Sequence, residues 1–335
     1  MVLVTGATGL VGAHLVLHLL ENQQQVRAIF RSEKSIEKTR KLFHLYHKDF
    51  LFDKIEWVPA DITDVPSLTP AFQAIDYVYH CAAFISFDSN DEKLVRKTNI
   101  EGTANIVNLS LDFKIKKLLF VSSIAALGDL KAHETVVTEE TDWNPELQHS
   151  DYAISKHGAE MEVWRGQQEG LQVAIINPGV ILGPGFWNSG SGEIFTRVAK
   201  GLLFYTKGTT GFVSVDDVVK MMFQVMERKG SGEQYVAVAE NISFEKILSS
   251  IAIALQVKKP AFYSAPWVTS IGWVADWILS DVFNRRRKLS KRMARSLHEH
   301  HYFSNQKAKE VLDFKFHDIG DTIKKTVSFY PENKS

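Results

Sequence analysis

A glycine-rich turn at the start of the chain limits the fold more than any other feature of the sequence. Gly6, Gly9 and Gly12 follow the apolar stretch Val2–Thr5 and begin a helical pattern, with the spacing GxxGxxG. Gly6 permits a tight turn, Gly9 lets a pyrophosphate approach the backbone, and Gly12 allows the helix to pack on the strand. The alternative is an ordinary βα turn. The position between a strand and a helix favours a dinucleotide at the helix N-terminus, where free N–H groups and the helix dipole attract phosphates.

Short β-rich stretches alternate with helical patterns through the first half of the chain. The strands are nearly all apolar, as a parallel sheet covered on both faces requires, and right-handed crossovers connect such strands. We therefore predict an α/β fold with a Rossmann-type, doubly wound parallel sheet. Strands are expected at Val2–Thr5, Gln25–Phe30, Ile55–Pro59, Asp76–Cys81, Lys117–Ser122 and Gln172–Asn177, and helices at Leu10–Glu21, Glu33 to about His47, Val65–Ala74, about Asp91–Phe113 and Tyr152–Glu169.

The sequence pattern changes after Asn177. The turns Asn-Pro-Gly (177–179) and Gly-Pro-Gly (183–185) interrupt the chain, and a stretch rich in Gly and Ser follows. We therefore expect a dinucleotide-binding domain at residues 1–177 and a smaller, mostly helical substrate-binding domain at residues 178–335. Residues 212–239 are expected to return in part to the first domain.

Composition excludes several classes of function. Lys plus Arg and Asp plus Glu both number 39, so the chain has no overall field that would attract nucleic acid. Cys81 is the only cysteine, which excludes an intrachain disulfide. No apolar run reaches the roughly 18 residues of a membrane span, and no cationic segment followed by an apolar run begins the sequence. We expect a cytoplasmic protein without a signal peptide or stable membrane insertion.

Two positions after the second and third strands bear on the choice of cofactor. Arg31 lies where an NAD-preferring site usually places a carboxylate for the ribose 2′-OH. A guanidinium pairs with a 2′-phosphate, which favours NADP over NAD, and the alternative is a solvated arginine or one stacked on adenine. Asp61 and Ile62 follow the third strand and could reach the adenine edge, but Asp61 could equally cap the helix that starts near Val65.

A tyrosine and a lysine share one face of a predicted helix. Tyr152 and Lys156 lie at i and i+4, and Ser122-Ser123 end the fifth strand at the edge where the glycine turn lies. A nearby ammonium favours the phenolate and lowers the tyrosine pKa, so that Tyr152 could exchange a proton with a carbonyl or alcohol oxygen. A serine hydroxyl there could polarise the same oxygen. The fragment YxxxK alone is weak evidence, because both residues are common on helix surfaces.

Taken together, these residues make the chain resemble an extended short-chain dehydrogenase/reductase from Val2 to at least Val219. The matching stretches occur in the family's order. They are TGATGLVG (5–12), Asp61-Ile62, His80-Cys81-Ala82-Ala83, Asn-Ile-Glu-Gly-Thr (99–103), Val121-Ser122-Ser123, Tyr-Ala-Ile-Ser-Lys (152–156), Asn-Pro-Gly (177–179) and Phe-Val-Ser-Val-Asp-Asp (212–217).

The resemblance implies roles for individual residues. Ser123, Tyr152 and Lys156 would form the catalytic triad, and Asn99 would support it. We take Cys81 and His80 to be packed residues rather than a nucleophile and a ligand. No metal is expected. The residues expected to contact the cofactor are Gly6, Thr8, Gly9, Leu10, Val11, Gly12, Arg31, Asp61, Ile62, Ala82, Ala83, Val121, Tyr152, Lys156, Pro178, Gly179 and Val180.

Within this superfamily the chain is most similar to the branch of dihydroflavonol reductases and 3β-hydroxysteroid dehydrogenases. Residues 26–31 resemble its NADP-type second strand, and residues 208–217 lack the arginine-bearing insert of nucleotide-sugar epimerases. Residues 124–128 lack the Thr or Ser with an aromatic residue of epimerases and the Asp-Glu pair of dehydratases. Ser214 departs from the histidine of many relatives.

Three functions stay open at this point. The first is an NADP-dependent reductase or dehydrogenase that acts on a carbonyl or alcohol carbon of a small, lipophilic substrate. The second is a nucleotide-diphosphate-sugar epimerase with bound NAD, and the third is a protein that senses NADP without catalysis. A homodimer is expected by analogy alone.

Two segments of the second half have more than one interpretation. Residues 262–283 contain Trp267, Trp273 and Trp277 and could form a wall for a lipophilic substrate, a core helix or an interfacial contact with a membrane. We favour wall or core. The cluster His-Glu-His-His (298–301) could hold a metal, but the ligands of a metal site must converge with support around them, and we expect none here.

Overall fold

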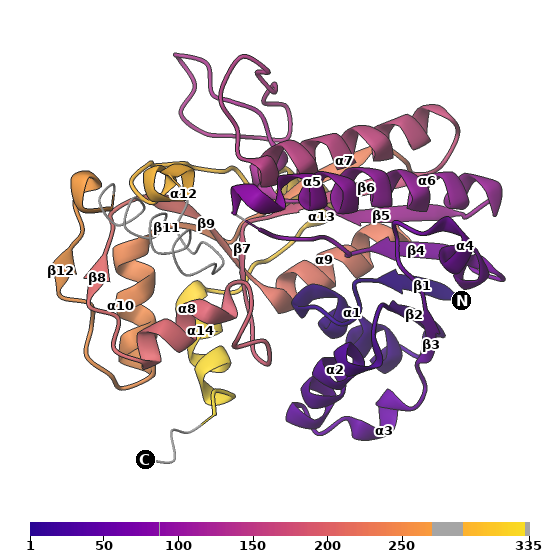
Figure 1. The fold of residues 1–335 in the computed structure, drawn as a ribbon, viewed down its shortest axis with the longest axis horizontal. Helices are drawn as coiled ribbons and strands as arrows, with labels where there is room; N and C mark the ends of the chain where they lie inside the picture. Colours follow the sequence, from indigo (N-terminus) through magenta and orange to yellow (C-terminus); the bar gives the residue numbers. More distant parts are fainter. Residues whose placement is uncertain (87, 270–290, 332–335) are drawn as a thin grey trace.

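The structure is a computed structural model that describes residues 1–86, 88–269 and 291–331. Among these residues, a seven-stranded sheet with the strand order β10-β6-β5-β4-β1-β2-β3 forms the centre of the molecule (Figure 1). All of its neighbouring strands pair in parallel. The strands are β1 (Val2–Thr5), β2 (Val26–Phe30), β3 (Glu56–Pro59), β4 (Tyr77–His80), β5 (Lys117–Val121), β6 (Val173–Pro178) and β10 (Glu233–Ala237).

The strand order reverses beside β1, and this reversal determines where a ligand can bind. β1 pairs with β2 on one side and with β4 on the other, so the chain crosses from one edge of the sheet to the opposite half after β3. The helices that follow β1 and β4 cover opposite faces of the sheet, and in this topology a ligand crevice lies at the carboxyl ends of these two strands. This topology confirms the predicted Rossmann-type doubly wound sheet.

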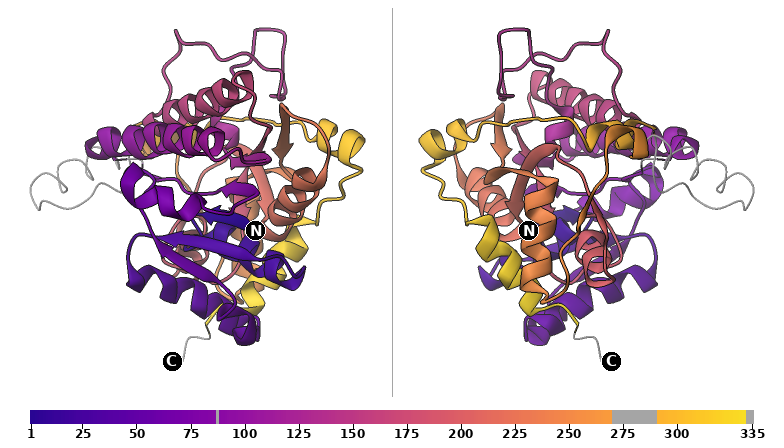
Figure 2. Two further views of the ribbon diagram at one scale, coloured as in Figure 1. Left: turned by 90° about the vertical axis from the view of Figure 1, so that its right-hand side faces the viewer. Right: turned by 90° about the vertical axis from the view of Figure 1, so that its left-hand side faces the viewer.

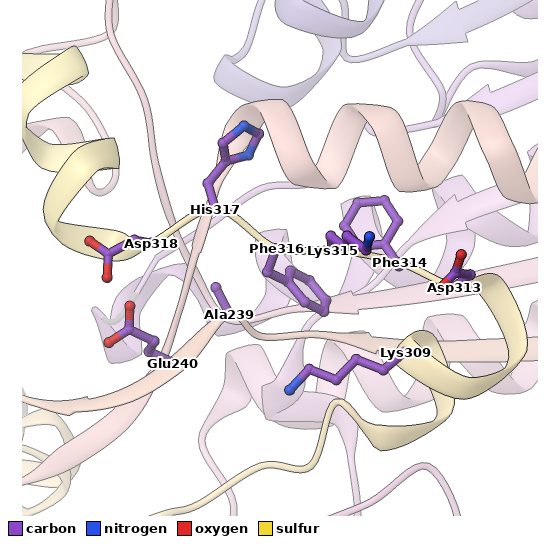
Figure 3. A pocket seen from close by; sticks show the side chains of 9 residues that line it. All are labelled: Ala239, Glu240, Lys309, Asp313, Phe314, Lys315, Phe316, His317 and Asp318. Carbon is purple, nitrogen blue, oxygen red and sulfur yellow. The ribbon is translucent and has the colours of Figure 1, made fainter.

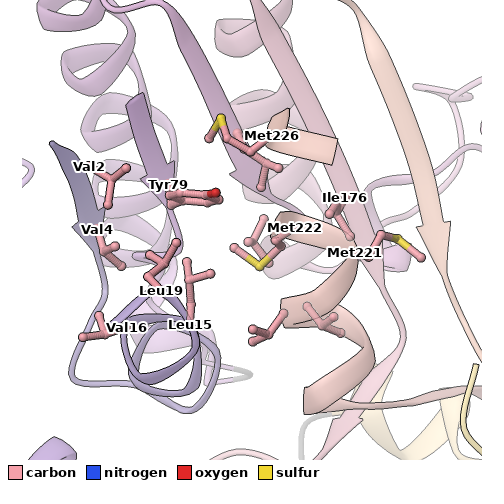
Figure 4. Close-up of a cluster of buried hydrophobic side chains, with 14 of the residues drawn as sticks. Val2, Val4, Leu15, Val16, Leu19, Tyr79, Ile176, Met221, Met222 and Met226 are labelled. Carbon is pink, nitrogen blue, oxygen red and sulfur yellow. The ribbon is translucent and has the colours of Figure 1, made fainter. Parts of the chain in front are cut away.

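Each face of the sheet has its own hydrophobic core. Val2 and Val4 belong to one core and Leu3 to the other, because successive side chains of a strand point to opposite faces. Helices α1 (Leu10–Glu21) and α9 (Val215–Glu227) cover the first face, where Figure 4 shows Leu15 and Leu19 of α1 and Met221, Met222 and Met226 of α9 among the packed side chains. Helices α6 (Gly102–Asp112) and α7 (Asp151–Gln168) cover the other face. The peripheral helices are α2 (Glu33–Leu45), α3 (Asp49–Phe52), α4 (Val65–Leu68), α5 (Glu92–Arg96) and α13 (Gln306–Leu312).

A second group of elements lies beside the sheet and has a core of its own. Figures 1 and 2 show helices and two short sheets at one end of the molecule. Leu182, Phe195, Phe212 and Ile251 are buried at their centre. The sheets are β11 (Glu240–Ser243) with β9 (Thr209–Ser214) and β7 (Val180–Leu182), and β12 (Phe262–Tyr263) with β8 (Phe204–Tyr205); the helices are α8 (Gly192–Ala199), α10 (Phe244–Ala254), α12 (Lys291–Ser296) and α14 (Ile319–Ser328).

Residues 212–239 lie in both parts of the molecule. Phe212 belongs to the second core, whereas α9 packs on the large sheet and β10 pairs with β6, with Tyr235 opposite Ile176. The domain limits at residues 1–177 and 178–335 stay a prediction. No helix among the described residues is long and apolar enough to cross a bilayer.

Two expected helices are interrupted in the structure. The helix expected at about Asp91–Phe113 consists of α5, a π-helical turn at Lys97–Glu101 and α6. The helix expected at Val65–Ala74 consists of α4 and a 3-10 turn at Thr69–Phe72. Pro70 explains the second interruption, because proline has no N–H for the helical hydrogen bond.

A buried lysine holds the end of α9 against the large sheet. The Nζ of Lys117, on β5, donates to the carbonyl oxygens of Val225 at 2.8 Å and Arg228 at 3.0 Å. These carbonyls belong to the last turn of α9 and its C-cap, where the helix leaves acceptors without partners. Burial lowers the Lys117 pKa, and the two carbonyls compensate for part of that penalty.

We expect Lys117→Met to destabilise the fold by about 2 kcal/mol, because two buried carbonyls lose a charged donor. The free energy of unfolding from urea titration measures the effect. Lys116→Met is the matched control, because the neighbouring lysine is exposed and pairs with Asp76 at the surface. Equal urea midpoints for the two variants would contradict this role of Lys117.

Candidate active site

The glycine turn forms a cradle that a side chain would fill. Gly6 has a φ of +70°, and a Cβ there would lie 2.6 Å from the backbone nitrogen of Ala82. A Cβ on Gly12 would lie 2.2 Å from the Gly6 carbonyl oxygen. Gly9 caps α1 without a side-chain hydrogen bond, so first-turn N–H groups remain available to an anion. The residues present therefore fit the pyrophosphate of a dinucleotide, with Thr8, Leu10 and Val11 partly exposed beside them.

The other residues expected at the cofactor lie just beyond the carboxyl ends of the strands. Arg31 follows β2 and is exposed. Asp61 follows β3, and its Oδ1 accepts from both the backbone N and the Oγ1 of Thr63 at 2.8 Å. Asp61 therefore closes a turn and does not cap the helix that starts at Val65, because Asp64 occupies the N-cap position. Ala82 follows β4 and Val121 ends β5. Pro178 ends β6, Gly179 lies between β6 and β7, and Val180 begins β7.

A chain of hydrogen bonds links the end of β1 to α6 beneath the crevice. The ring of His80, which is fully buried, contacts the Oγ1 of Thr5 through Nδ1 at 2.7 Å and that of Thr103 through Nε2 at 3.0 Å. Burial lowers the His80 pKa to about 3, which keeps the ring neutral. Burial also raises the Cys81 pKa to about 12, so the thiol is a poor nucleophile. His80 and Cys81 are therefore packed residues, as the sequence predicts.

Asn99 fixes the backbone that follows β4. Its Oδ1 accepts from the backbone nitrogen of Phe84 at 2.7 Å, and its Nδ2 donates to the Phe84 carbonyl at 3.0 Å and to the Oγ of Ser155 at 2.9 Å. The π-helical turn at Lys97–Glu101 contains this residue. Asn99 thus joins the loop after β4 to the helix that contains the candidate tyrosine. The turn is consistent with a functional site, where such bulges are frequent.

Ser123, Tyr152 and Lys156 lie together at the edge of the sheet. A hydrogen bond joins the side chains of Tyr152 and Ser123. The Nζ of Lys156 donates to the carbonyl oxygen of Val121 at 2.8 Å and lies 4.1 Å above the ring of Phe120. Lys156 is almost completely buried, and this burial lowers its pKa to about 7.

The pKa of Tyr152 departs from the sequence-based expectation. We expected Lys156 to lower it, whereas burial raises it in the structure and the hydrogen bond with Ser123 opposes part of the rise. The physical reason is that the Lys156 ammonium is directed to the Val121 carbonyl and is itself partly neutralised by burial. The phenol is therefore protonated at neutral pH and able to donate.

A buried polar network behind the triad was not found from the sequence. The Nδ2 of Asn177 donates to Glu160 Oε1 at 2.6 Å and to the Ser123 carbonyl at 2.9 Å. The Nε2 of Gln234, on β10, donates to the Oδ1 of Asn177 at 2.9 Å. Burial raises the pKa of Glu160. The signal available in the sequence was the spacing of Glu160, one helical turn after Lys156.

Two cavities differ in their relation to the triad. One of about 280 Å³ is lined in part by Glu160, His157 and Gln234, so it reaches the polar network behind the predicted triad. The other, of about 490 Å³, lies between residues 239–240 and the segment 313–318 (Figure 3). Glu240 accepts from the Ile319 backbone nitrogen at 2.9 Å at this cavity, which anchors the C-terminal segment. Neither cavity is lined by Asn99, Ser123, Tyr152 or Lys156.

The histidines of the cluster at residues 298–301 have different partners. His298 Nε2 contacts Thr269 Oγ1 at 2.9 Å, and His300 Nδ1 contacts Thr209 Oγ1 at 3.0 Å. His301 faces Glu299 at 3.3 Å. Within the described part of the chain, no group of three or more His, Cys, Asp or Glu side chains is placed to hold a metal ion. Trp273 and Trp277 lie outside the described residues.

A model of the NAD-dependent epimerase/dehydratase family matches residues 2–238. The chain belongs to this family. A putative dihydroflavonol 4-reductase of Synechocystis sp. is 29% identical over 286 residues, which are 83% of this chain and 79% of that protein. Anthocyanidin reductase of Arabidopsis thaliana is 27% identical and covers 73% of this chain and 77% of its own length. The chain is thus an NAD(P)-dependent enzyme of the extended short-chain dehydrogenase/reductase type, similar to the dihydroflavonol reductases.

Solved structures show the same fold. The UDP-glucose 4-epimerase of Thermotoga maritima, in complex with UDP-glucose, is 20% identical and has a TM-score of 0.77, with 98% of this chain and 97% of that one covered. The UDP-glucuronic acid 4-epimerase of Bacillus cereus, in complex with NAD, is 18% identical and has a TM-score of 0.74, with 98% and 95% covered. At these identities the likeness concerns the fold alone.

Two glycine substitutions separate the structural from the binding role of the turn. We expect Gly12→Ala to lower the free energy of unfolding by several kcal/mol, because the added Cβ would overlap the Gly6 carbonyl. Gly9→Ala should leave the free energy of unfolding nearly unchanged, since its Cβ would lie 3.4 Å from the nearest backbone atom. The same variant should still weaken dinucleotide binding, because the added methyl group would lie where the pyrophosphate approaches the backbone. Urea titration and dinucleotide titration measure the two effects, and a Gly9→Ala protein with full affinity would contradict the second.

Proposed function

We propose that the protein is an NADP-dependent reductase or dehydrogenase that transfers hydride between nicotinamide and a carbonyl or alcohol carbon of a small, lipophilic substrate. The observation that supports this best is the hydrogen-bonded pair of Ser123 and Tyr152, with Lys156 one helical turn away, at the edge that contains the glycine cradle. Relatives named dihydroflavonol 4-reductase, anthocyanidin reductase and cinnamoyl-CoA reductase support a reductase over an epimerase.

The residues of the site divide the chemistry between them. When bound, NADPH supplies the hydride that adds to the carbonyl carbon. Tyr152 donates its phenolic proton to the carbonyl oxygen, so that an alcohol forms, and Ser123 donates a hydrogen bond that holds this oxygen. Lys156 in its charged form favours the phenolate that remains. Asn99 and the Glu160–Asn177 pair hold the backbone on either side of the reacting groups.

Arg31 supports NADP as the preferred cofactor. It is exposed at the carboxyl end of β2, where the adenosine ribose of a dinucleotide lies in this fold. No carboxylate occupies this position, and a guanidinium can pair with the 2′-phosphate through two hydrogen bonds. Three further expectations stay predictions: the contacts of the other cofactor residues, the cytoplasmic location and the homodimer.

We expect Tyr152→Phe to lower turnover at least about 100-fold, because the proton donor is lost while the ring still packs. The affinity for NADPH should stay nearly unchanged. The assay follows NADPH oxidation with a panel of aliphatic, aromatic and steroid ketones and aldehydes, and UDP-sugars are followed by chromatography in parallel.

The same assay separates the competing functions. Interconversion of sugars without net oxidation of NADPH would replace the reductase by an epimerase. Binding of NADPH without turnover of any carbonyl or sugar would favour a sensor. Unchanged turnover in Tyr152→Phe would remove Tyr152 from the mechanism.

Replacement of Arg31 tests the cofactor preference. We expect Arg31→Ala to lower kcat/KM for NADPH about 10- to 100-fold, which corresponds to the loss of a hydrogen-bonded charge pair, and to change kcat/KM for NADH little. Lys38→Ala, an exposed lysine on α2, is the matched control for a lost positive charge. A parallel fall for both cofactors in Arg31→Ala would contradict recognition of the 2′-phosphate.

A further inference from the structure

Large apolar side chains are exposed where two short strands meet at one end of the molecule. β8 and β12 lie side by side there (Figure 1). Trp267 is 67% exposed and Phe262 58% exposed, although aromatic side chains usually pack inside. We call this end of the strand pair the aromatic face; it consists of Leu203, Phe204, Phe262, Tyr263 and Trp267. Because successive strand residues point to opposite sides, Phe262 and Tyr263 lie on the two sides of the strand pair.

The backbone holds the aromatic face in place. The amide nitrogens of Ala261 and Phe262 both donate to the Leu203 carbonyl, at 3.0 and 3.1 Å, and the Ser264 nitrogen donates to the Tyr205 carbonyl at 2.8 Å. The rings of Phe204 and Phe262 lie 5.9 Å apart. Phe204, Phe262 and Tyr263 therefore project from a hydrogen-bonded pair of strands, whereas Leu203 precedes β8 and Trp267 follows β12 in the chain.

Lysines flank the aromatic face along the chain, and the two segments that form it contain no carboxylates. Lys200 and Lys207 flank β8, and Lys258 and Lys259 precede β12; all four are exposed. The Nζ of Lys207 lies 4.9 Å above the ring of Tyr263. The sequence has no Asp or Glu at residues 194–215 or 246–275. In a chain with equal numbers of acidic and basic residues, this segregation makes a local cationic surface.

We propose that the aromatic face and its four lysines dock on the surface of a lipid bilayer that contains anionic headgroups. Trp and Tyr rings favour the boundary between acyl chains and headgroups, where their apolar part is buried and their polar atoms stay hydrated. Lysines beside them attract anionic lipids. The contact would be peripheral, in keeping with the absence of a membrane-spanning helix among the described residues. This inference goes beyond the proposed reductase activity and does not depend on it.

Charge argues against a second copy of the chain as the partner. A two-fold symmetric contact places the same patch of both copies face to face, so the four lysines would meet four lysines. Strands of two residues also offer little edge for pairing between chains. An anionic surface satisfies the lysines and covers the aromatic side chains together.

The test is co-sedimentation of the full chain with phosphatidylcholine vesicles, with and without phosphatidylglycerol. We expect binding to the anionic vesicles that falls steeply at high salt, because screening weakens the attraction. Each lysine near such a surface contributes about fivefold in affinity, so Lys258→Glu/Lys259→Glu should weaken binding by at least about 25-fold. Phe262→Ser/Trp267→Ser should weaken binding at all salt concentrations.

Matched controls replace exposed residues elsewhere. Lys34→Glu/Lys38→Glu on α2 reverses two charges, and Phe50→Ser removes an aromatic ring that is 65% exposed on α3. We expect both controls to bind vesicles as the unchanged chain does, and the far-UV circular dichroism spectrum with the urea midpoint verifies that each variant is folded. The charge-reversal pair tests the proposal even if the aromatic pair does not fold.

Three outcomes would overturn the proposal. The first is no binding to anionic vesicles at low salt. The second is equal weakening by the face variants and the controls, which would indicate attraction by overall charge. The third is a dimer in light scattering that the face variants dissociate, without vesicle binding, which would make the face a contact between proteins.

Discussion

The close approach of the first βα turn to the loop after β4 is the constraint on which the site depends. Gly6 lies so near the backbone of Ala82 that no side chain fits between them. Thr5 extends this junction, because its Oγ1 accepts from the Ala82 nitrogen at 3.1 Å and contacts His80. The two strands beside the topological switch are thereby joined at their carboxyl ends, and the crevice for a dinucleotide has fixed walls.

Behind the triad, buried polar groups hold the backbone instead of apolar packing. Glu160, Asn177 and Gln234 come from α7, β6 and β10, which are far apart in the sequence. Asn177 connects the Ser123 carbonyl to the turn that continues into Pro178 and Gly179. A buried polar network destabilises a core unless its groups are paired, and apolar side chains would pack there at lower cost. We therefore infer that this nearly complete network serves to position the backbone at the site and not to stabilise the fold.

Lys156 illustrates the same balance between stability and function. Its ammonium is buried beside a carbonyl and an aromatic ring, and its pKa falls to about 7. A group with a lowered lysine pKa binds fewer protons in the folded than in the unfolded state, so its contribution to stability improves as pH rises from about 7 toward the unfolded value. The Val121 carbonyl and the face of the Phe120 ring compensate for part of this penalty.

Sequence alone determined the alternation of strands and helices, the glycine turn between β1 and α1, and the placement of Tyr152 and Lys156 one turn apart on a helix, because these depend on local periodicity and spacing. The tertiary structure decided what no local pattern specifies. Residues 233–237 pair with β6, Gln234 joins Asn177 and Glu160 in a buried network, and burial raises the Tyr152 pKa although Lys156 is one turn away. Desolvation and strand pairing depend on segments distant in the chain, so they exist only once the fold brings those segments together.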